Sequence, residues 1–239
     1  MRGLKMLKSL QWLTQDLPEM PENEDWLSEG ERTRLAGMRF PKRRNDWKLG
    51  RWTAKRAIRA CRFGDVTPDS ILEIRAAADG APEPYLNDEP ARFSISISHS
   101  HERSLCAVGP GELRIGCDLE FVEPRENIFL QDYFTQEECA FVERMEPEDR
   151  ALASTLIWSA KESALKILRE GLRRDTRSIT IRSASVPPAP SAWSPWTGTC
   201  LQPSSTFYGW WRSLDGFIYT IASDHFTTLP NQLFISFAP

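Results

Sequence analysis

The chain has 239 residues and a mass of 27.3 kDa, which suits one large domain or two small ones. Hydrophobic residues make up 41%, charged residues 26% and aromatic residues 10%, proportions that exclude collagen, coiled coils and wholesale disorder. No apolar run approaches the roughly 20 residues of a membrane-spanning helix, and the N-terminus lacks the apolar core and cleavage site of a signal peptide. We therefore expect a cytoplasmic protein.

The net charge of -3 hides a strongly basic segment. Residues 32–62 hold twelve Lys or Arg against one acid, Asp46, so this segment carries +11 and the rest of the chain carries -14. Such a segment suits an anionic ligand, whether a nucleic acid, a nucleotide cofactor or an acidic partner protein. A solvated helix face is the alternative, and charge alone does not decide between them.

Cysteine and histidine usage limits the metal chemistry. Five cysteines form no C-x-x-C pair, which argues against a disulfide framework and against a thiolate zinc site. Three histidines, of which only His99 and His101 are close neighbours, are too few for a histidine-based centre. We expect any metal to be bound by oxygen ligands.

The first half of the chain predicts helices followed by strands. Ser28 has the character of an N-cap, and Pro41 limits the first helix so that a second begins near residues 45–46. The proline-rich residues 76–90 predict an irregular loop. Period-2 alternation predicts strands on either side of this loop and a hairpin after it, at residues 71–75, 93–98 and 105–108.

The second half begins with another alternating run, residues 113–122, which places Asp118 and Glu120 on one face of a strand. Two helices are expected next, with Gly171 as the C-cap of the second. The dipeptide Asp215-Gly216 predicts a type I′ hairpin, and the last ten residues an edge strand. The ranges are helices at 127–145 and 148–170, a strand at 178–183, an irregular excursion at 183–205, and hairpin strands at 207–214 and 217–223.

The order helix, strand, hairpin in the first half resembles the order in the second, although the two halves share little sequence similarity. The simplest interpretation is an α+β fold of two similar lobes that meet near residue 112. We assign residues 1–112 to an N-terminal lobe and residues 113–239 to a C-terminal lobe.

Several side chains have the spacing of a divalent-metal site. Asp118 and Glu120 lie about 7 Å apart on one strand face, a separation that a hard cation can bridge. On the long helix, Trp158, Glu162 and Lys166 form one stripe at i, i+4 and i+8. If Glu162 faces the other two carboxylates, the three negative charges need a divalent ion to compensate them. Lys166, one turn along the helix, would then bind the phosphates of a ligand. The alternatives are acidic decoration of an exposed strand and a surface Glu-Lys pair.

A second group of donors lies at the end of a predicted strand. Ser98 and His99 can donate hydrogen bonds to a phosphate, and the basic helices can complete an anion pocket. For His99 alone, a satisfied core histidine is the alternative. No P-loop and no G-x-G-x-x-G is present, so kinase-like and dinucleotide-binding functions lack a motif.

Three segments together resemble the signature of the 4′-phosphopantetheinyl transferases, in the two-lobed, monomeric type that activates carrier proteins. They are S-I-S-H-S at 96–100, G-C-D-L-E at 116–120 and W-S-A-K-E-S-A-L-K at 158–166. They follow the family's order and spacing, and the resemblance covers residues 30–182. The sequence departs from the family pattern at Ala81 of Gly80-Ala81-Pro82, a position where the family more often has Lys. It also departs at Ser96 and Cys117.

The resemblance implies transfer of the phosphopantetheine arm of coenzyme A to a serine of an acyl- or peptidyl-carrier protein, with release of adenosine 3′,5′-bisphosphate. It implies a metal site for Mg²⁺ and a pyrophosphate contact in the C-terminal lobe, and coenzyme A contacts near the basic helices. By motif, the metal ligands are Asp118, Glu120 and Glu162, with Glu162 also a candidate base. Lys166 would contact the pyrophosphate, and the further coenzyme A contacts would be Arg34, Arg75, Ser98 and His99.

Two other functions remain open from the sequence. One is a catalytically silent module of the same fold that binds coenzyme A or a carrier protein. The other is nucleic-acid binding through residues 32–62, which no base-reading motif supports. We expect no nucleic-acid or membrane partner.

Overall fold

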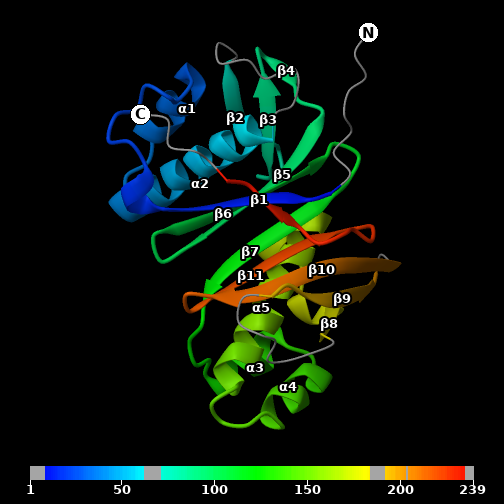
Figure 1. The fold of residues 1–239 in the computed structure, drawn as a ribbon. Coiled ribbons are helices and arrows are strands. Elements are labelled where there is room, and N and C mark those ends of the chain that lie inside the picture. The colour runs from blue at the N-terminus through cyan, green and yellow to red at the C-terminus, as the bar shows by residue number, and fades with distance from the viewer. Residues whose placement is uncertain (1–8, 62–70, 184–191, 203, 235–239) are drawn as a thin grey trace. The chain divides into compact units, whose positions relative to one another are not determined.

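The computed structural model describes residues 9–61, 71–183, 192–202 and 204–234 (Figure 1). The chain forms two compact units, one made of the described residues up to Leu113 and from Pro230 onward, and the other of Arg114–Leu229. The sequence placed everything after residue 112 in one lobe. The C-terminal residues group with the first unit because β12 (Asn231–Gln232) pairs in parallel with β1 (Gln11–Asp16).

In the first unit, a long helix covers a small sheet (Figure 1). The sheet has the order β12-β1-β6-β5, and β2, β3 and β4 form a second sheet. Ala54, Ala57 and Ile58 of α2 pack with Leu13 and Val108 of the strands in one core. The remaining bounds are α1 (Glu29–Ala36), α2 (Pro41–Ala60), β2 (Leu72–Ala76), β3 (Pro82–Leu86), β4 (Glu89–Pro90), β5 (Phe93–Ser100) and β6 (Arg103–Pro110), with a 3-10 turn at Leu17–Glu19.

The prediction for this unit needs three corrections. Helix α2 begins at Pro41, four residues earlier than expected, because proline suits the first turn of a helix, where its missing donor is not needed. Strand β1 was not predicted. Residues 76–90 are not irregular: Pro82 and Pro84 lie at alternate positions of β3, so both missing donors face away from β2, and the pairing with β2 survives.

The second unit places a helix against a five-stranded sheet of order β7-β11-β10-β9-β8. The largest described core joins α5 to this sheet, with Leu156, Ala160 and Ala164 on the helix and Trp196, Trp211 and Ile218 on the strands. Its bounds are β7 (Ile115–Phe121), α3 (Asn127–Tyr133), α4 (Gln136–Glu143), α5 (Arg150–Leu168), β8 (Ile179–Ser183), β9 (Ser194–Leu201), β10 (Ser204–Leu214) and β11 (Phe217–Ser223), with 3-10 turns at Gly171–Arg173 and Thr176–Ser178.

Predictions for this unit are partly confirmed. The hairpin at Asp215-Gly216 is confirmed, with φ of 53° and 78° at the two residues, both positive as a type I′ turn requires. The expected helix over 127–145 is two helices, because Thr135 caps the start of α4. Helix α5 ends at Leu168 with Arg169 in the left-handed conformation, ahead of Gly171. The excursion over 183–205 contains β9, although residues 184–191 lie outside the described part.

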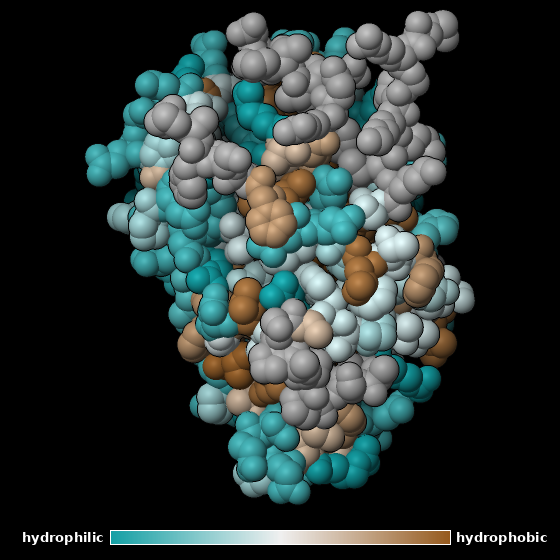
Figure 2. Space-filling view, in the orientation of Figure 1, coloured by the Kyte–Doolittle hydropathy of each residue, from teal (hydrophilic) through white to brown (hydrophobic). Residues whose placement is uncertain are grey.

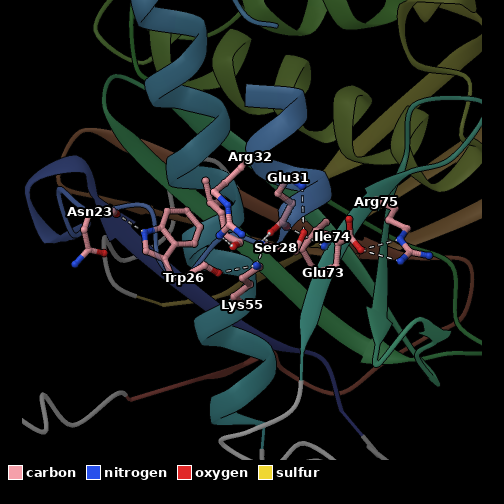
Figure 3. A network of polar contacts seen from close by, with 10 residues as sticks. Asn23, Trp26, Ser28, Glu31, Arg32, Lys55, Glu73, Ile74 and Arg75 are labelled. Atoms are coloured by element: carbon pink, nitrogen blue, oxygen red, sulfur yellow. Dashed lines mark hydrogen bonds and ion pairs between the residues drawn. The ribbon is translucent and has the colours of Figure 1, made fainter. Parts of the chain in front are cut away.

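Each unit contains a buried ion pair between a lysine and a glutamate, with similar surrounding contacts. In the first unit, Ser28 caps α1 in a capping box with Glu31, and Glu31 accepts from Lys55 Nζ at 2.5 Å and from the backbone N–H of Ile74 at 3.0 Å (Figure 3). Lys55 also donates to the backbone oxygen of Trp26 at 2.9 Å. The carboxylate thus joins α1, α2 and β2.

In the second unit, Thr135 and Glu138 form the capping box of α4, and Glu138 pairs with Lys161 Nζ at 2.8 Å and accepts from the N–H of Ile181 at 2.8 Å. Lys161 is fully buried and also donates to the backbone oxygens of Thr176 and Ile179. The two units therefore secure their long helices by the same set of contacts.

The surface carries apolar residues in separate places. Exposed large apolar residues such as Phe40, Leu201 and Phe226 come from different elements, and on the face in Figure 2 the apolar residues are scattered among hydrophilic ones. In the described part of the chain, no helix combines the length and apolar character needed to span a membrane.

Candidate functional site

Strand β7 and helix α5 approach each other closely enough for their side chains to form one site. A Cβ atom at Gly116 would overlap the backbone oxygen of Ser163, so only glycine permits this approach. Thr220 of β11 adds hydrogen bonds to Ser159 and Ser163 at 2.9 and 2.7 Å, all three residues being fully buried. The face of β7 with Asp118 and Glu120 therefore meets the stripe of Trp158, Glu162 and Lys166 on α5.

Asp118 lies beside Lys166. Lys166 Nζ donates to Asp118 Oδ1 at 2.9 Å and to the backbone oxygen of Cys117 at 2.7 Å. Burial lowers the pKa of Lys166, but the charges of Asp118 and Glu162 outweigh it, so the pKa lies above its ordinary value. Lys166 therefore carries a positive charge within the carboxylate cluster at neutral pH.

Glu120 has a partner on each oxygen. Trp158 Nε1 donates to Oε1 at 3.1 Å, and Arg125 Nη2 donates to Oε2 at 3.2 Å. Burial and the charge of Asp118 raise the pKa of Glu120, while Arg125 and the Trp158 hydrogen bond oppose the rise. The sequence did not identify Arg125, which follows the D-x-E motif by five residues and has no regular spacing to it.

Glu162 is the least compensated of the three carboxylates. Its Oε1 atom is buried and has no hydrogen-bond partner among the described residues. Burial and the charge of Asp118 raise the pKa of Glu162 to about 7, with Lys166 opposing the rise and Glu120 adding to it. The three carboxylates therefore interact through their charges.

The raised pKa of Glu162 predicts a pH dependence of stability in metal-free buffer. Between its ordinary value of 4.5 and about 7, the folded protein holds a proton that the unfolded chain has lost. The free energy of unfolding should therefore fall as pH rises through this range. Urea unfolding at pH 5 and pH 7.5 with EDTA measures the fall, and Glu162→Gln should reduce it. An equal fall in that variant would contradict the assignment.

The donor set fits a hard divalent cation. Carboxylate oxygens are the ligands that Mg²⁺ prefers, and the orphaned buried oxygen of Glu162 is a position that a cation would satisfy. Over the described ranges, however, no three His, Cys, Asp or Glu side chains are close enough to form a ready metal site. In the described conformation, Asp118 pairs with Lys166 and Glu120 pairs with Arg125.

The first unit contains a separate basic pocket of about 470 Å³, lined mainly by α2. Trp47 Nε1 and Arg51 Nε are buried there without hydrogen-bond partners among the described residues, and the Arg51 guanidinium lies 4.4 Å from the centre of the Trp47 ring. Burial lowers the pKa of Arg51 to about 10. The charge of Glu31 opposes this shift and the charge of Arg34 adds to it, and Arg51 stays charged at neutral pH. The lining residues are Phe40, Lys42, Arg43, Asp46, Trp47, Gly50, Arg51, Ile97 and His99.

Only one of the four predicted coenzyme A contacts lines this pocket. His99 does so, with Nδ1 3.9 Å from Asp46 Oδ2. Ser98 is buried, and its backbone oxygen accepts from Ser104. Arg34 is exposed on α1, and its charge acts on Arg51. Arg75 pairs with Glu73 at 2.8 Å (Figure 3) and also with Asp88, so its charge is already engaged.

Sequence reasoning did not single out Trp47, and it left the role of Arg51 open within the basic run. Their spacing of four residues puts them on one helix face, and this was the available signal. Charge alone could not separate Arg51 from the many exposed basic residues around it.

The second unit, with its β7–α5 carboxylates, is the part of the chain that matches a known family. Residues 114–206 match the model of the 4′-phosphopantetheinyl transferase superfamily. This stretch is therefore similar to that superfamily, and the match confirms the resemblance seen in the sequence at the level of the superfamily. The match supports a transferase activity of the phosphopantetheinyl type. The search of curated proteins found no match to the chain.

Proposed function

We propose that the protein transfers the phosphopantetheine arm of coenzyme A to a serine of an acyl- or peptidyl-carrier protein, in a reaction that depends on Mg²⁺. The observation that carries the proposal is the meeting of Asp118 and Glu120 on β7 with Glu162 and Lys166 on α5, inside the stretch that matches the superfamily. The two-lobed, monomeric type is part of the same proposal, as is the cytoplasm as its compartment. The recurrence of the Glu31–Lys55 contacts in the second unit supports two similar lobes.

In the proposed reaction, the carrier serine oxygen attacks the phosphorus that bears the pantetheine arm. The new O–P bond forms as the bond to the adenosine 3′,5′-bisphosphate leaving group breaks. Glu162 takes the serine proton, directly or through a water molecule. Lys166, charged within the cluster, binds the pyrophosphate. Mg²⁺ held by Asp118, Glu120 and Glu162 would supply stabilisation of the charge on the pyrophosphate oxygens.

We further propose that the basic pocket of the first unit binds the 3′-phosphate end of coenzyme A. The pocket lining includes the basic side chains of Lys42 and Arg43, the charged Arg51 and the imidazole of His99. Charged donors of this kind form strong hydrogen bonds with phosphate oxygens. The proposal gives part of the basic run a ligand, and the exposed remainder can attract an acidic carrier protein.

Replacing Arg51 with methionine should weaken coenzyme A binding about tenfold or more, because a charge-assisted hydrogen bond in a buried pocket is lost. Calorimetric titration with coenzyme A and with dephospho-coenzyme A measures the change. The loss should be larger for coenzyme A, which carries the 3′-phosphate. Arg59→Met, on the same helix but outside the pocket lining, is the control. Equal affinity of Arg51→Met and wild type for coenzyme A would contradict the pocket assignment.

Intact-protein mass spectrometry tests the activity itself. Apo carrier proteins are incubated with the protein, coenzyme A and Mg²⁺, and with EDTA as the control. A metal-dependent mass gain of one phosphopantetheine arm on the carrier serine would establish the reaction. Coenzyme A binding without transfer to any carrier would favour the silent binding module.

A further inference from the structure

The two oxygens of Glu120 have partners of different kinds. Oε1 accepts from the indole of Trp158, and the Trp158 ring is packed against Phe129 and Tyr133 at centroid distances of 5.0 and 5.1 Å. Oε2 accepts from Arg125. One oxygen is therefore held by a rigid, neutral donor and the other by a cation.

Arg125 also has contacts apart from Glu120. It lies between β7 and α3, where its Nη1 is 3.4 Å from Glu123 and its guanidinium is 5.0 Å from the centre of the Phe129 ring. The Arg125 and Glu120 side chains are 14% and 25% exposed, so their ion pair is partly shielded from solvent. Glu123 and the Phe129 ring are alternative partners that keep Arg125 nearby when it leaves Glu120.

We propose that Arg125 is a positioning residue that competes with the divalent ion for Oε2 of Glu120. The inference rests on the proposed function, in which Asp118, Glu120 and Glu162 hold Mg²⁺. In the described conformation, Arg125 pairs with Glu120 and compensates its charge. Arg125 gives up Oε2 when the ion binds, while Trp158 keeps Oε1 in place. The strength of this ion pair thus sets the affinity of the site for metal.

The test measures Mg²⁺ affinity directly, by isothermal titration calorimetry of the intact chain without coenzyme A. Arg125→Met removes the competitor and should tighten Mg²⁺ binding about fivefold or more, because the ion no longer has to displace a partly buried cation from Glu120. Arg125→Gln, a polar variant, should act in the same direction and serves if the methionine variant fails to fold. Glu120→Gln should weaken Mg²⁺ binding.

The double variant Arg125→Met/Glu120→Gln separates competition from a general charge effect. If Arg125 acts through Glu120, its replacement has no effect on affinity once Glu120 is neutral. Tightening that persists in the double variant would show a through-space charge effect and overturn the proposal. Arg177→Met, which removes the same charge from an exposed pair with Asp175, should leave the affinity unchanged.

The outcomes also separate this inference from the proposed function. Suppose that Asp118→Ala abolishes Mg²⁺ binding while Arg125→Met leaves the affinity unchanged. This result would overturn the competition by Arg125 but retain the proposed metal site. If neither the wild type nor Arg125→Met binds Mg²⁺, both the competition and the proposed metal site are overturned. Tightening in Arg125→Met that vanishes in the double variant supports both.

Discussion

Replacing Glu162 with glutamine should lower the rate of phosphopantetheine transfer by about 10²- to 10⁴-fold, the usual contribution of a general base. The substitution keeps the size of the side chain but removes both its basicity and its negative charge. Because burial and Asp118 already disfavour the charged form of Glu162, the folded state should not be destabilised at neutral pH. Initial rates of mass gain on a carrier protein, with saturating coenzyme A and Mg²⁺, measure the effect.

Glu143→Gln is the matched control, since Glu143 is an exposed glutamate of α4 in the same unit. Its rate should equal that of the wild type. The test requires that the wild type transfers the arm. If Glu162→Gln then has a rate within twofold of wild type, Glu162 is not the base, and the superfamily match is unaffected.

Lys161→Met should destabilise the second unit by about 3–5 kcal/mol. The substitution leaves the carboxylate of Glu138 buried without its cation, and breaking a buried ion pair by removing one partner has an effect of this size. The hydrogen bonds to the backbone oxygens of Thr176 and Ile179 are lost as well. Urea unfolding followed by circular dichroism gives the free energy of unfolding.

Two comparisons make this prediction specific. Lys55→Met removes the corresponding cation from Glu31 and should destabilise the first unit by a similar amount. Arg182→Met breaks an exposed pair with Glu137 and should change the stability by less than about 1 kcal/mol. If Lys161→Met had as small an effect as Arg182→Met, the buried pair would not secure α5.

Local patterns predicted most of the regular elements. The alternation in residues 93–98 and the Asp215-Gly216 turn depend on neighbouring residues, and both predictions are confirmed. Strand β3 was missed because its prolines argue against a strand unless their missing donors face away from the partner, which only the pairing register reveals. The cap of α4 at Thr135 was visible as a T-x-x-E capping box and was overlooked.

The repeated ion pair shows the same limit. W-T-A-K at 52–55 and W-S-A-K at 158–161 place Lys55 and Lys161 alike, but four residues in so long a chain are a weak signal. Only the tertiary structure shows that Glu31 and Glu138 are their partners. These partners lie more than twenty residues away in the chain, beyond the reach of any periodic pattern.

The sequence by itself determined that Asp118 and Glu120 share a strand face and that Glu162 and Lys166 share a helix face, because both follow from the backbone periods of a strand and a helix. Only the tertiary structure decided that these faces meet, through the close approach at Gly116. It also decided that Lys166 and Arg125 bind the first two carboxylates and that Glu162 keeps a buried oxygen without a partner among the described residues. Charge partners and pKa values depend on distances across the fold, which local sequence does not encode.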